Sequence, residues 1–276
     1  MREMISRYAP APTGFLHLGH VVNAIYVWGF TRARGGRVLL RIEDHDRQRS
    51  RPTFEAAIVE DLEWLGFRAD GPMVRQSDRG DIYSHALDTL RAQGLVYVCA
   101  CSRTKIAAAA RSDELWYPGT CRDRGVAEAP GLGLRVRLEP TVERFVDLRH
   151  GPQEQRPSEQ CGDLLVRDRA GNWTYQFVAT VDDYVQGVTH VIRGDDLLAS
   201  TGRQILLARL LGRVEPPVFL HHPLIMKSPT QKLSKSDGAS GVRDLRAKGW
   251  TAADVINQAA ALAGLDLRNL FREIAP

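Results

Sequence analysis

Long apolar runs are absent from this sequence, and that absence excludes a membrane protein built on spanning helices. No segment approaches the roughly 20 consecutive apolar residues that such a helix needs. The amino terminus, MREM, does not open an apolar core of the kind found in signal peptides. No internal repeat, low-complexity tract or heptad run is present, which excludes solenoids and coiled coils. We therefore expect a cytoplasmic protein.

Cysteine is also scarce, and its distribution is uneven. Three of the four cysteines, Cys99, Cys101 and Cys121, lie in one short stretch, whereas Cys161 stands apart and is interpreted as structural. In a reducing compartment, clustered cysteines favour a metal over a disulfide. Three thiolates would supply most of a tetrahedral zinc site, but no histidine lies nearby in the sequence to complete it. Three buried free thiols are the alternative.

What remains is ordinary globular composition. The chain has 276 residues, of which 43% are hydrophobic and 25% charged, enough for a large α/β core with a small inserted subdomain. The net charge of +4 and the isoelectric point near 9.0 indicate a mild basic excess. Such an excess is compatible with a nucleic-acid partner but does not establish one, because many basic proteins bind none.

The stretch RYAPAPTGFLHLGH, residues 7–20, organises the amino-terminal part of the chain. A short apolar strand precedes it, a proline-glycine turn interrupts it, and a helical pattern begins at its end. This arrangement places His17 and His20 at a helix start, where backbone N–H groups and the helix dipole favour phosphate. The alternative is a tight turn whose histidines only cap the helix.

A second cationic stretch lies far downstream. Residues 227–240, KSPTQKLSKSDGAS, contain Lys232 and Lys235 among serines and a glycine. This composition suits a phosphate-binding loop. Without the histidines upstream, a solvated surface loop would be the better interpretation.

Charged side chains follow the carboxyl ends of two predicted strands. Glu43 comes directly after the apolar run RVLLRI, and Arg193 closes the run THVIR. In open α/β sheets, ligands gather at the carboxyl ends of strands, so both residues are candidates for a binding site. A charged cap that pairs Glu43 with Arg41 or Arg47 is the alternative.

The rest of the chain reads as further helices and strands. Apolar spacing predicts helices over residues 20–34, 54–65, 77–93, 201–211 and 242–263, the last broken at Gly249, and a helix that begins at Tyr175. Strands are predicted over residues 95–98, 132–138, 144–148 and 163–168, where the last three form one antiparallel sheet connected by a polar loop over 151–160.

Together these segments carry a family resemblance. HLGH and KLSKS resemble the paired signatures of class I aminoacyl-tRNA synthetases, and RYAPAPTGFLHLGH, LLRIEDHD and VTHVIRGDDLL resemble their glutamyl branch. The resemblance covers residue 7 to about residue 245. It implies an α/β, Rossmann-like fold with a zinc-bearing α+β insertion: a first catalytic half over residues 1–98, the insertion over 99–172, a second half with the KLSKS loop over 173–240, and a helical stem over 241–276.

The resemblance also implies substrates and the residues that bind them. L-glutamate would be bound by Arg7, Ala9, Ala11, Glu43, Tyr175 and Arg193, with Arg7 and Tyr175 on its side-chain carboxylate, Glu43 on its ammonium and Arg193 on the other carboxylate or its water shell. ATP with Mg²⁺ would be bound by His17, Gly19, His20 and Lys235, and catalysis would use His17, His20, Lys232 and Lys235. In one respect the chain departs from the family, since Ala11 replaces the usual serine.

In this family a tyrosine completes the zinc site, in the pattern Cys-x-Cys … Tyr-x-x-x-Cys. This sequence has that pattern in Cys99, Cys101, Tyr117 and Cys121, which implies one structural zinc ion per chain.

Little chain follows KLSKS. In this respect the sequence resembles those short members of the branch that have no anticodon-binding domain. In them, activated glutamate passes to the queuosine at the wobble position of tRNA(Asp), so the expected partner is that anticodon stem-loop and the expected state a monomer. The alternatives are a truncated synthetase that charges a tRNA 3′ end, a non-catalytic paralogue, and a general nucleotidyltransferase.

Overall fold

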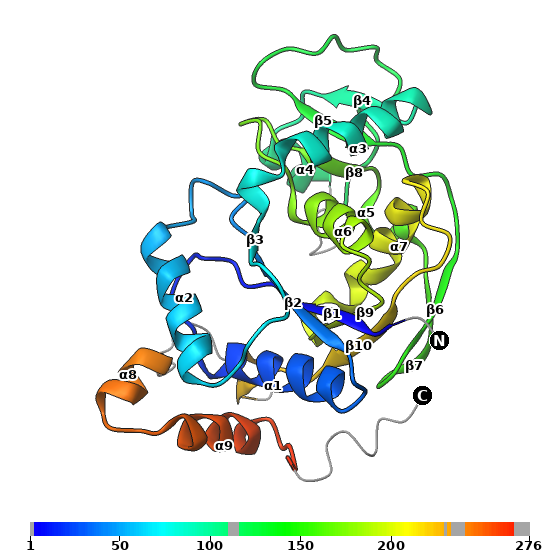
Figure 1. Cartoon of the computed structure of the whole chain (residues 1–276). Helices are drawn as coiled ribbons and strands as arrows, with labels where there is room; N and C mark the ends of the chain where they lie inside the picture. The colour runs from blue at the N-terminus through cyan, green and yellow to red at the C-terminus, as the bar shows by residue number, and fades with distance from the viewer. Residues whose placement is uncertain (1–2, 110–115, 229–230, 233–240, 268–276) are drawn as a thin grey trace.

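A computed structural model describes residues 3–109, 116–228, 231–232 and 241–267 of the chain. Its centre is a set of parallel strands (Figure 1). Strand β1 (Ile5–Tyr8) pairs with β2 (Arg37–Ile42), and β2 pairs with the short β3 (Val74–Arg75). Strand β9 (His190–Gly194) pairs in the same sense with β10 (Val218–His222). The backbone N–H of Thr189 donates to the carbonyl of Ile5 at 2.9 Å, so β1 and β9 lie side by side.

Helices cover both faces of this sheet. Helix α1 (Leu18–Arg32) packs on one face, because its apolar side chains join the core formed with β1, β2 and β9. Helix α9 (Ala252–Leu262) packs against α1, and in Figure 1 the two run side by side. On the other face, Ile205 of α7 (Thr201–Leu210) packs with Val191 of β9 and Phe219 of β10. Helix α7 also shares a second apolar core with α3 (Gly80–Ala92) and α6 (Tyr175–Val185). Three further helices are α2 (Pro52–Trp64), α4 (Arg103–Ala109) and α8 (Val242–Ala247).

A separate antiparallel sheet lies at the far end of the molecule from α9 (Figure 1). Its order is β4 (Val96–Cys99), β5 (Gly133–Val136) and β8 (Leu164–Arg167). In sequence it lies between α3 and α6, where we expected an inserted unit. Among the described residues, no helix combines the length and apolar character needed to cross a bilayer.

Two predictions about this region were wrong. Residues 151–160, predicted as a polar loop, form β7 (Gly151–Gln155) and the short helix α5 (Pro157–Cys161). Residues 144–148 do not continue the antiparallel sheet of β5 and β8. They fall largely in β6 (Glu143–Asp147), which pairs with β7 on one side and, in parallel, with β10 on the other. The strand itself was predicted, but its sheet was not: the ring of Phe145 packs against Phe219 of β10, and the carboxylate of Asp147 accepts from the backbone N–H of His221.

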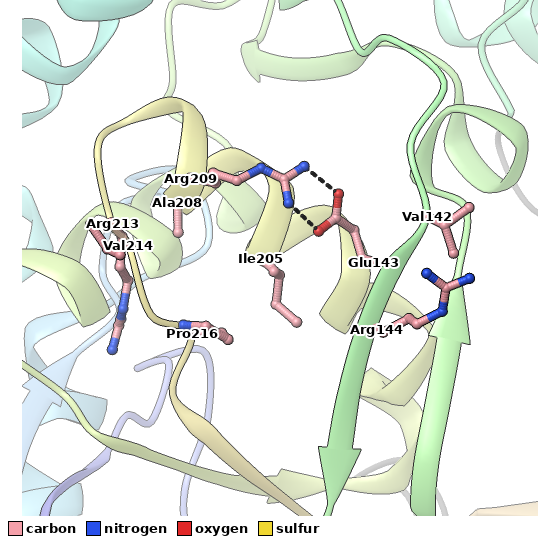
Figure 2. Close-up of a pocket in the computed structure, with 9 residues that line it drawn as sticks. All are labelled: Val142, Glu143, Arg144, Ile205, Ala208, Arg209, Arg213, Val214 and Pro216. Atoms are coloured by element: carbon pink, nitrogen blue, oxygen red, sulfur yellow. Dashed lines mark hydrogen bonds and ion pairs between the residues drawn. The ribbon is translucent and has the colours of Figure 1, made fainter.

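Helix α7 is fixed to the amino-terminal end of β6 by one ion pair. Both terminal nitrogens of Arg209 donate to the carboxylate of the buried Glu143, at 2.6 and 2.8 Å, across a pocket of about 270 Å³ (Figure 2). The candidate site residues lie elsewhere, since the pocket is lined by Val142, Glu143, Arg144, Ile205, Ala208, Arg209, Arg213, Val214 and Pro216.

Asp61 on α2 supplies a test of the packing between α2 and α8. It is buried, its carboxylate lies 3.4 Å from the Nε of Arg243 on α8, and neither of its oxygens has a hydrogen bond in the described structure. Burial raises the pKa of Asp61 to about 6. A carboxyl whose pKa is raised by folding contributes stability below its unfolded pKa and loses that contribution as the pH rises through the folded pKa.

We therefore expect Asp61→Asn to gain stability relative to the wild type as the pH rises from 4 to 8, by up to about 3 kcal/mol. Urea unfolding at several pH values measures this difference. Asp88→Asn, which changes an exposed carboxyl on α3, should show no such trend. A difference between Asp61→Asn and the wild type that stays constant with pH would contradict the expectation.

Candidate active site

The HLGH segment forms the first turn of α1. His17 is the N-cap, and its Nδ1 accepts a hydrogen bond from the backbone N–H of Gly19 at 3.1 Å. The Nδ1 of His20 accepts from the backbone N–H of His17, also at 3.1 Å, and the two rings lie 3.9 Å apart. A side chain at Gly19 would lie 2.9 Å from the His17 ring, which explains the glycine. With Nδ1 as the acceptor, each neutral imidazole carries its proton on Nε2, as a donor.

The chain that follows KLSKS returns to this turn. Gly241 forms an antiparallel bridge with His17, and the N–H of Val242 donates to the carbonyl of Leu16 at 2.9 Å. Residues 233–240 lie outside the described residues, and so does the predicted Lys235. Lys232 lies in β12 (Gln231–Lys232), which pairs with β11 (Met226–Ser228). The segment after KLSKS therefore begins beside the histidines.

Arg7 and Arg41 share one carboxylate. The Nε of Arg7 and a terminal nitrogen of Arg41 both donate to the same oxygen of Asp183 on α6, at 3.0 and 2.8 Å. Arg41 is fully buried, and its other terminal nitrogen lies 3.3 Å from Glu43. Burial opposes the ionisation of Asp183, but the two guanidiniums outweigh it and hold the pKa of this carboxyl below its usual range. Burial raises the pKa of Glu43, against the pull of both arginines.

Arg193 has a different environment, because neutral acceptors surround it. Its guanidinium is buried and donates to His221, Gln204 and Thr201 at 2.9, 2.6 and 2.8 Å. None of the described carboxylates forms an ion pair with it. Burial lowers the pKa of Arg193, an effect that the nearby Tyr175 phenol opposes. Within the described part of the chain, Arg193 is therefore a buried cation that forms no ion pair, which is costly unless a ligand supplies an anion.

Tyr175 connects these groups. It is the first residue of α6, and burial raises the pKa of its phenol, an effect strengthened by the charge of Glu43. Arg193 and Arg7 act on the same phenol in the opposite direction, so Glu43, Arg193 and Arg7 all lie within electrostatic range of Tyr175.

The turn before α1 is joined to Glu43 through the backbone. The carbonyl of Pro10 accepts from the N–H of Glu43 at 2.9 Å, and Ala11, at the tip of the turn, is exposed.

The cysteine cluster forms at the edge of the antiparallel sheet. The sulfurs of Cys99, Cys101 and Cys121 all lie within 4.8 Å of one another. The phenol of Tyr117 lies 3.4 Å from the sulfur of Cys99 and accepts from the N–H of Cys121 at 2.8 Å. Cys161 is buried outside the cluster and donates to the carbonyl of Pro157. Three thiols and a phenol converge, so these side chains could hold a metal ion.

One contact in the site was not foreseen. His221, near the end of β10, accepts from the guanidinium of Arg193 and bonds to the carboxylate of Asp147 on β6. Its position in the sequence could have indicated this contact. His221 lies near the carboxyl end of a strand that runs parallel to the strand carrying Arg193, and the ends of parallel strands meet at the same edge of a sheet.

Residues 3–270 match the family model described as "tRNA synthetases class I (E and Q), catalytic domain". The chain belongs to this family, which confirms the resemblance read from its motifs.

Among curated proteins, it is 42% identical to the glutamyl-Q tRNA(Asp) synthetase of Rhodobacter capsulatus, over 91% of this chain and 98% of that protein. It is 40% identical to glutamate–tRNA ligase 2 of Chelativorans sp., over 94% of this chain and 56% of that protein. Among solved structures, a glutamate tRNA ligase from Elizabethkingia meningosepticum superimposes with a TM-score of 0.81 at 28% identity. That match covers 99% of this chain, which spans only 64% of the ligase.

The shared carboxylate predicts that Arg41 is essential to stability. We expect Arg41→Met to lower the free energy of unfolding by about 3–5 kcal/mol, because it leaves buried carboxylates without their partner. Urea unfolding followed by tryptophan fluorescence measures the change. The matched control is Arg37→Met on the same strand. Arg37 pairs with Glu3 at the surface, where solvent screens the charges, so its loss should leave the free energy of unfolding nearly unchanged. Equal losses in the two variants would contradict the prediction.

Proposed function

We propose that this protein activates L-glutamate with ATP and then transfers the glutamyl group to the queuosine at the wobble position of tRNA(Asp). The observation that carries this proposal is the similarity to the Rhodobacter capsulatus enzyme along nearly the whole length of both chains. Glutamate–tRNA ligase 2, by contrast, is matched over about half of its own length.

In the first step, a carboxylate oxygen of glutamate attacks the α-phosphorus of ATP, and the bond to the bridging oxygen breaks as pyrophosphate leaves. The protein contributes positioning and charge stabilisation rather than a nucleophile. His17 and His20 donate Nε2–H to phosphate oxygens at the start of α1, where Gly19 allows the backbone to approach. Lys232 and Lys235 balance the charge of the departing pyrophosphate, with Mg²⁺ bound to ATP.

The proposed contact with the side-chain carboxylate favours glutamate over glutamine. The guanidinium of Arg7 can only donate hydrogen bonds. The side-chain carboxylate of glutamate accepts them as an anion, whereas the amide of glutamine offers one neutral oxygen and an N–H that would meet a donor. Such a mismatch at buried polar groups can reject an analogue by about 10⁴–10⁵-fold.

Each proposed contact uses one part of the substrate. Arg7 and Tyr175 bind the side-chain carboxylate, Glu43 binds the ammonium, and Arg193 binds the remaining carboxylate. Ala9 and Ala11 offer only backbone groups from the turn.

Residues 99–172 are proposed as an insertion between catalytic halves over residues 1–98 and 173–240, with a helical stem over 241–276. Within this insertion, β6 and β7 extend the main sheet beside β10. Cys99, Cys101, Cys121 and Tyr117 would hold one zinc ion there. The donor set fits zinc, which binds thiolates tetrahedrally and stabilises small folds.

Activation is expected without tRNA. Purified protein should exchange pyrophosphate into ATP in the presence of glutamate, and not with glutamine. Labelled glutamate should then appear on tRNA(Asp) that contains queuosine and be recovered in an anticodon fragment after nuclease digestion. tRNA(Asp) without queuosine is the control. Label on the 3′ adenosine would instead identify a synthetase that charges tRNA, and an absence of exchange would identify a non-catalytic paralogue.

Metal analysis of protein purified without chelator should find about one zinc per chain. Cys121→Ser should lose most of that zinc and unfold at a lower temperature, because the ion's binding free energy stabilises the fold. Cys161→Ser is the matched control, since Cys161 is a buried thiol outside the cluster, and it should keep its zinc. A wild-type protein without zinc would remove the metal from the proposal, and so would a Cys121→Ser variant that retains it.

A further inference from the structure

His221 lies between two charged groups inside the main sheet. It belongs to β10, whose neighbours are β9, which carries Arg193, and β6, which carries Asp147. Its Nδ1 lies 2.7 Å from a carboxylate oxygen of Asp147, and its Nε2 lies 2.9 Å from the Nε of Arg193. All three side chains are buried, with at most 4% of each residue exposed.

These contacts determine the protonation state of the imidazole. The carboxylate of Asp147 can only accept, so the proton of His221 resides on Nδ1. Arg193 can only donate, so Nε2 offers its lone pair. Burial lowers the pKa of His221, which keeps the ring neutral at pH 7. Asp147 also accepts from the backbone N–H groups of His221, Arg149 and His150, at 3.0 to 3.1 Å, so its carboxylate stays ionised without an arginine.

We propose that Asp147 and His221 act together as a positioning pair for Arg193, which hold its guanidinium in place without neutralising it. A carboxylate in the position of His221 would fix Arg193 equally well but would consume the charge that the substrate needs. A protonated imidazole would repel it. A neutral imidazole with a fixed tautomer provides orientation and leaves the positive charge for the ligand.

The inference rests on the proposed function, because the ligand in question is the carboxylate of glutamate. It adds two residues that bind no substrate themselves. Arg7 and Arg41 show the contrast, since both are held by Asp183 and thereby largely compensated. Of the arginines in the site, Arg193 alone among the described residues is held only by neutral groups.

Two amide substitutions at His221 separate its two contacts. In His221→Asn, the side-chain amide takes the place of Nδ1 and donates to Asp147, but nothing replaces Nε2. In His221→Gln, the amide oxygen takes the place of Nε2 and accepts from Arg193. Pyrophosphate exchange then gives KM for glutamate, KM for ATP and kcat for each variant. We expect His221→Asn to raise KM for glutamate by about tenfold to a hundredfold, as the loss of a hydrogen bond to a charged group predicts.

We expect KM for ATP to change less than twofold in His221→Asn, and His221→Gln to recover most of the glutamate affinity. Asp147→Asn provides a second route if His221→Asn does not fold. The amide N–H of the variant faces Nδ1 of His221, so the imidazole proton moves to Nε2. An N–H on Nε2 then faces the N–H of Arg193, and the loss of this hydrogen bond should also raise KM for glutamate.

Equal KM for glutamate in wild type and folded variants would overturn the inference, and so would equal effects of His221→Asn and His221→Gln. A wild-type protein that does not exchange with glutamate would overturn the proposed function instead.

Discussion

The structure depends on a carboxylate buried between two guanidiniums. Asp183 on α6 binds Arg7 from β1 and Arg41 from β2, which precede it by 176 and 142 positions, so a single side chain joins two neighbouring strands to a helix far along the chain. Such a group is stable only when its partners are present, because an unpaired charge in the interior is strongly destabilising. The arginines of the pocket are therefore held in place before any ligand arrives, which is the preorganisation that selective binding requires.

Histidine serves the site in its neutral form. His17 and His20 accept backbone hydrogen bonds at Nδ1, so each neutral ring carries its proton on Nε2. His221 has the opposite tautomer and offers Nε2 as an acceptor to Arg193. Burial lowers the pKa of the adjacent His222 to about 4, so that ring is neutral too. In each case, the hydrogen-bond partner of one ring nitrogen determines whether the other nitrogen donates or accepts. Because the imidazoles are neutral, the charges of the pocket are those of its arginines and carboxylates.

Much of this could be predicted from the sequence, because the informative patterns are local. The run of apolar residues predicted β2 with its observed bounds, Arg37–Ile42, and the first turn of α1 was marked by HLGH. Strand β7 was missed because its sequence, GPQEQ, lacks the alternation of apolar and polar residues that predicts a strand. The contact between Asp147 and His221 joins residues 74 positions apart, and no local pattern encodes such a pairing.

Ala11, which replaces the family's serine, changes a side chain of the turn but not the turn's backbone hydrogen bond to Glu43. An exposed alanine at the tip of the turn offers no hydroxyl, yet the turn is still fixed through the hydrogen bond between Pro10 and Glu43. Backbone contacts from the turn are therefore preserved without the family's serine. In the proposed function, a contact that the serine hydroxyl would have made to the substrate falls to the charged side chains. Of these, Arg193 donates to neutral groups among the described residues, and the pairing of β6 with β10 places His221 beside it.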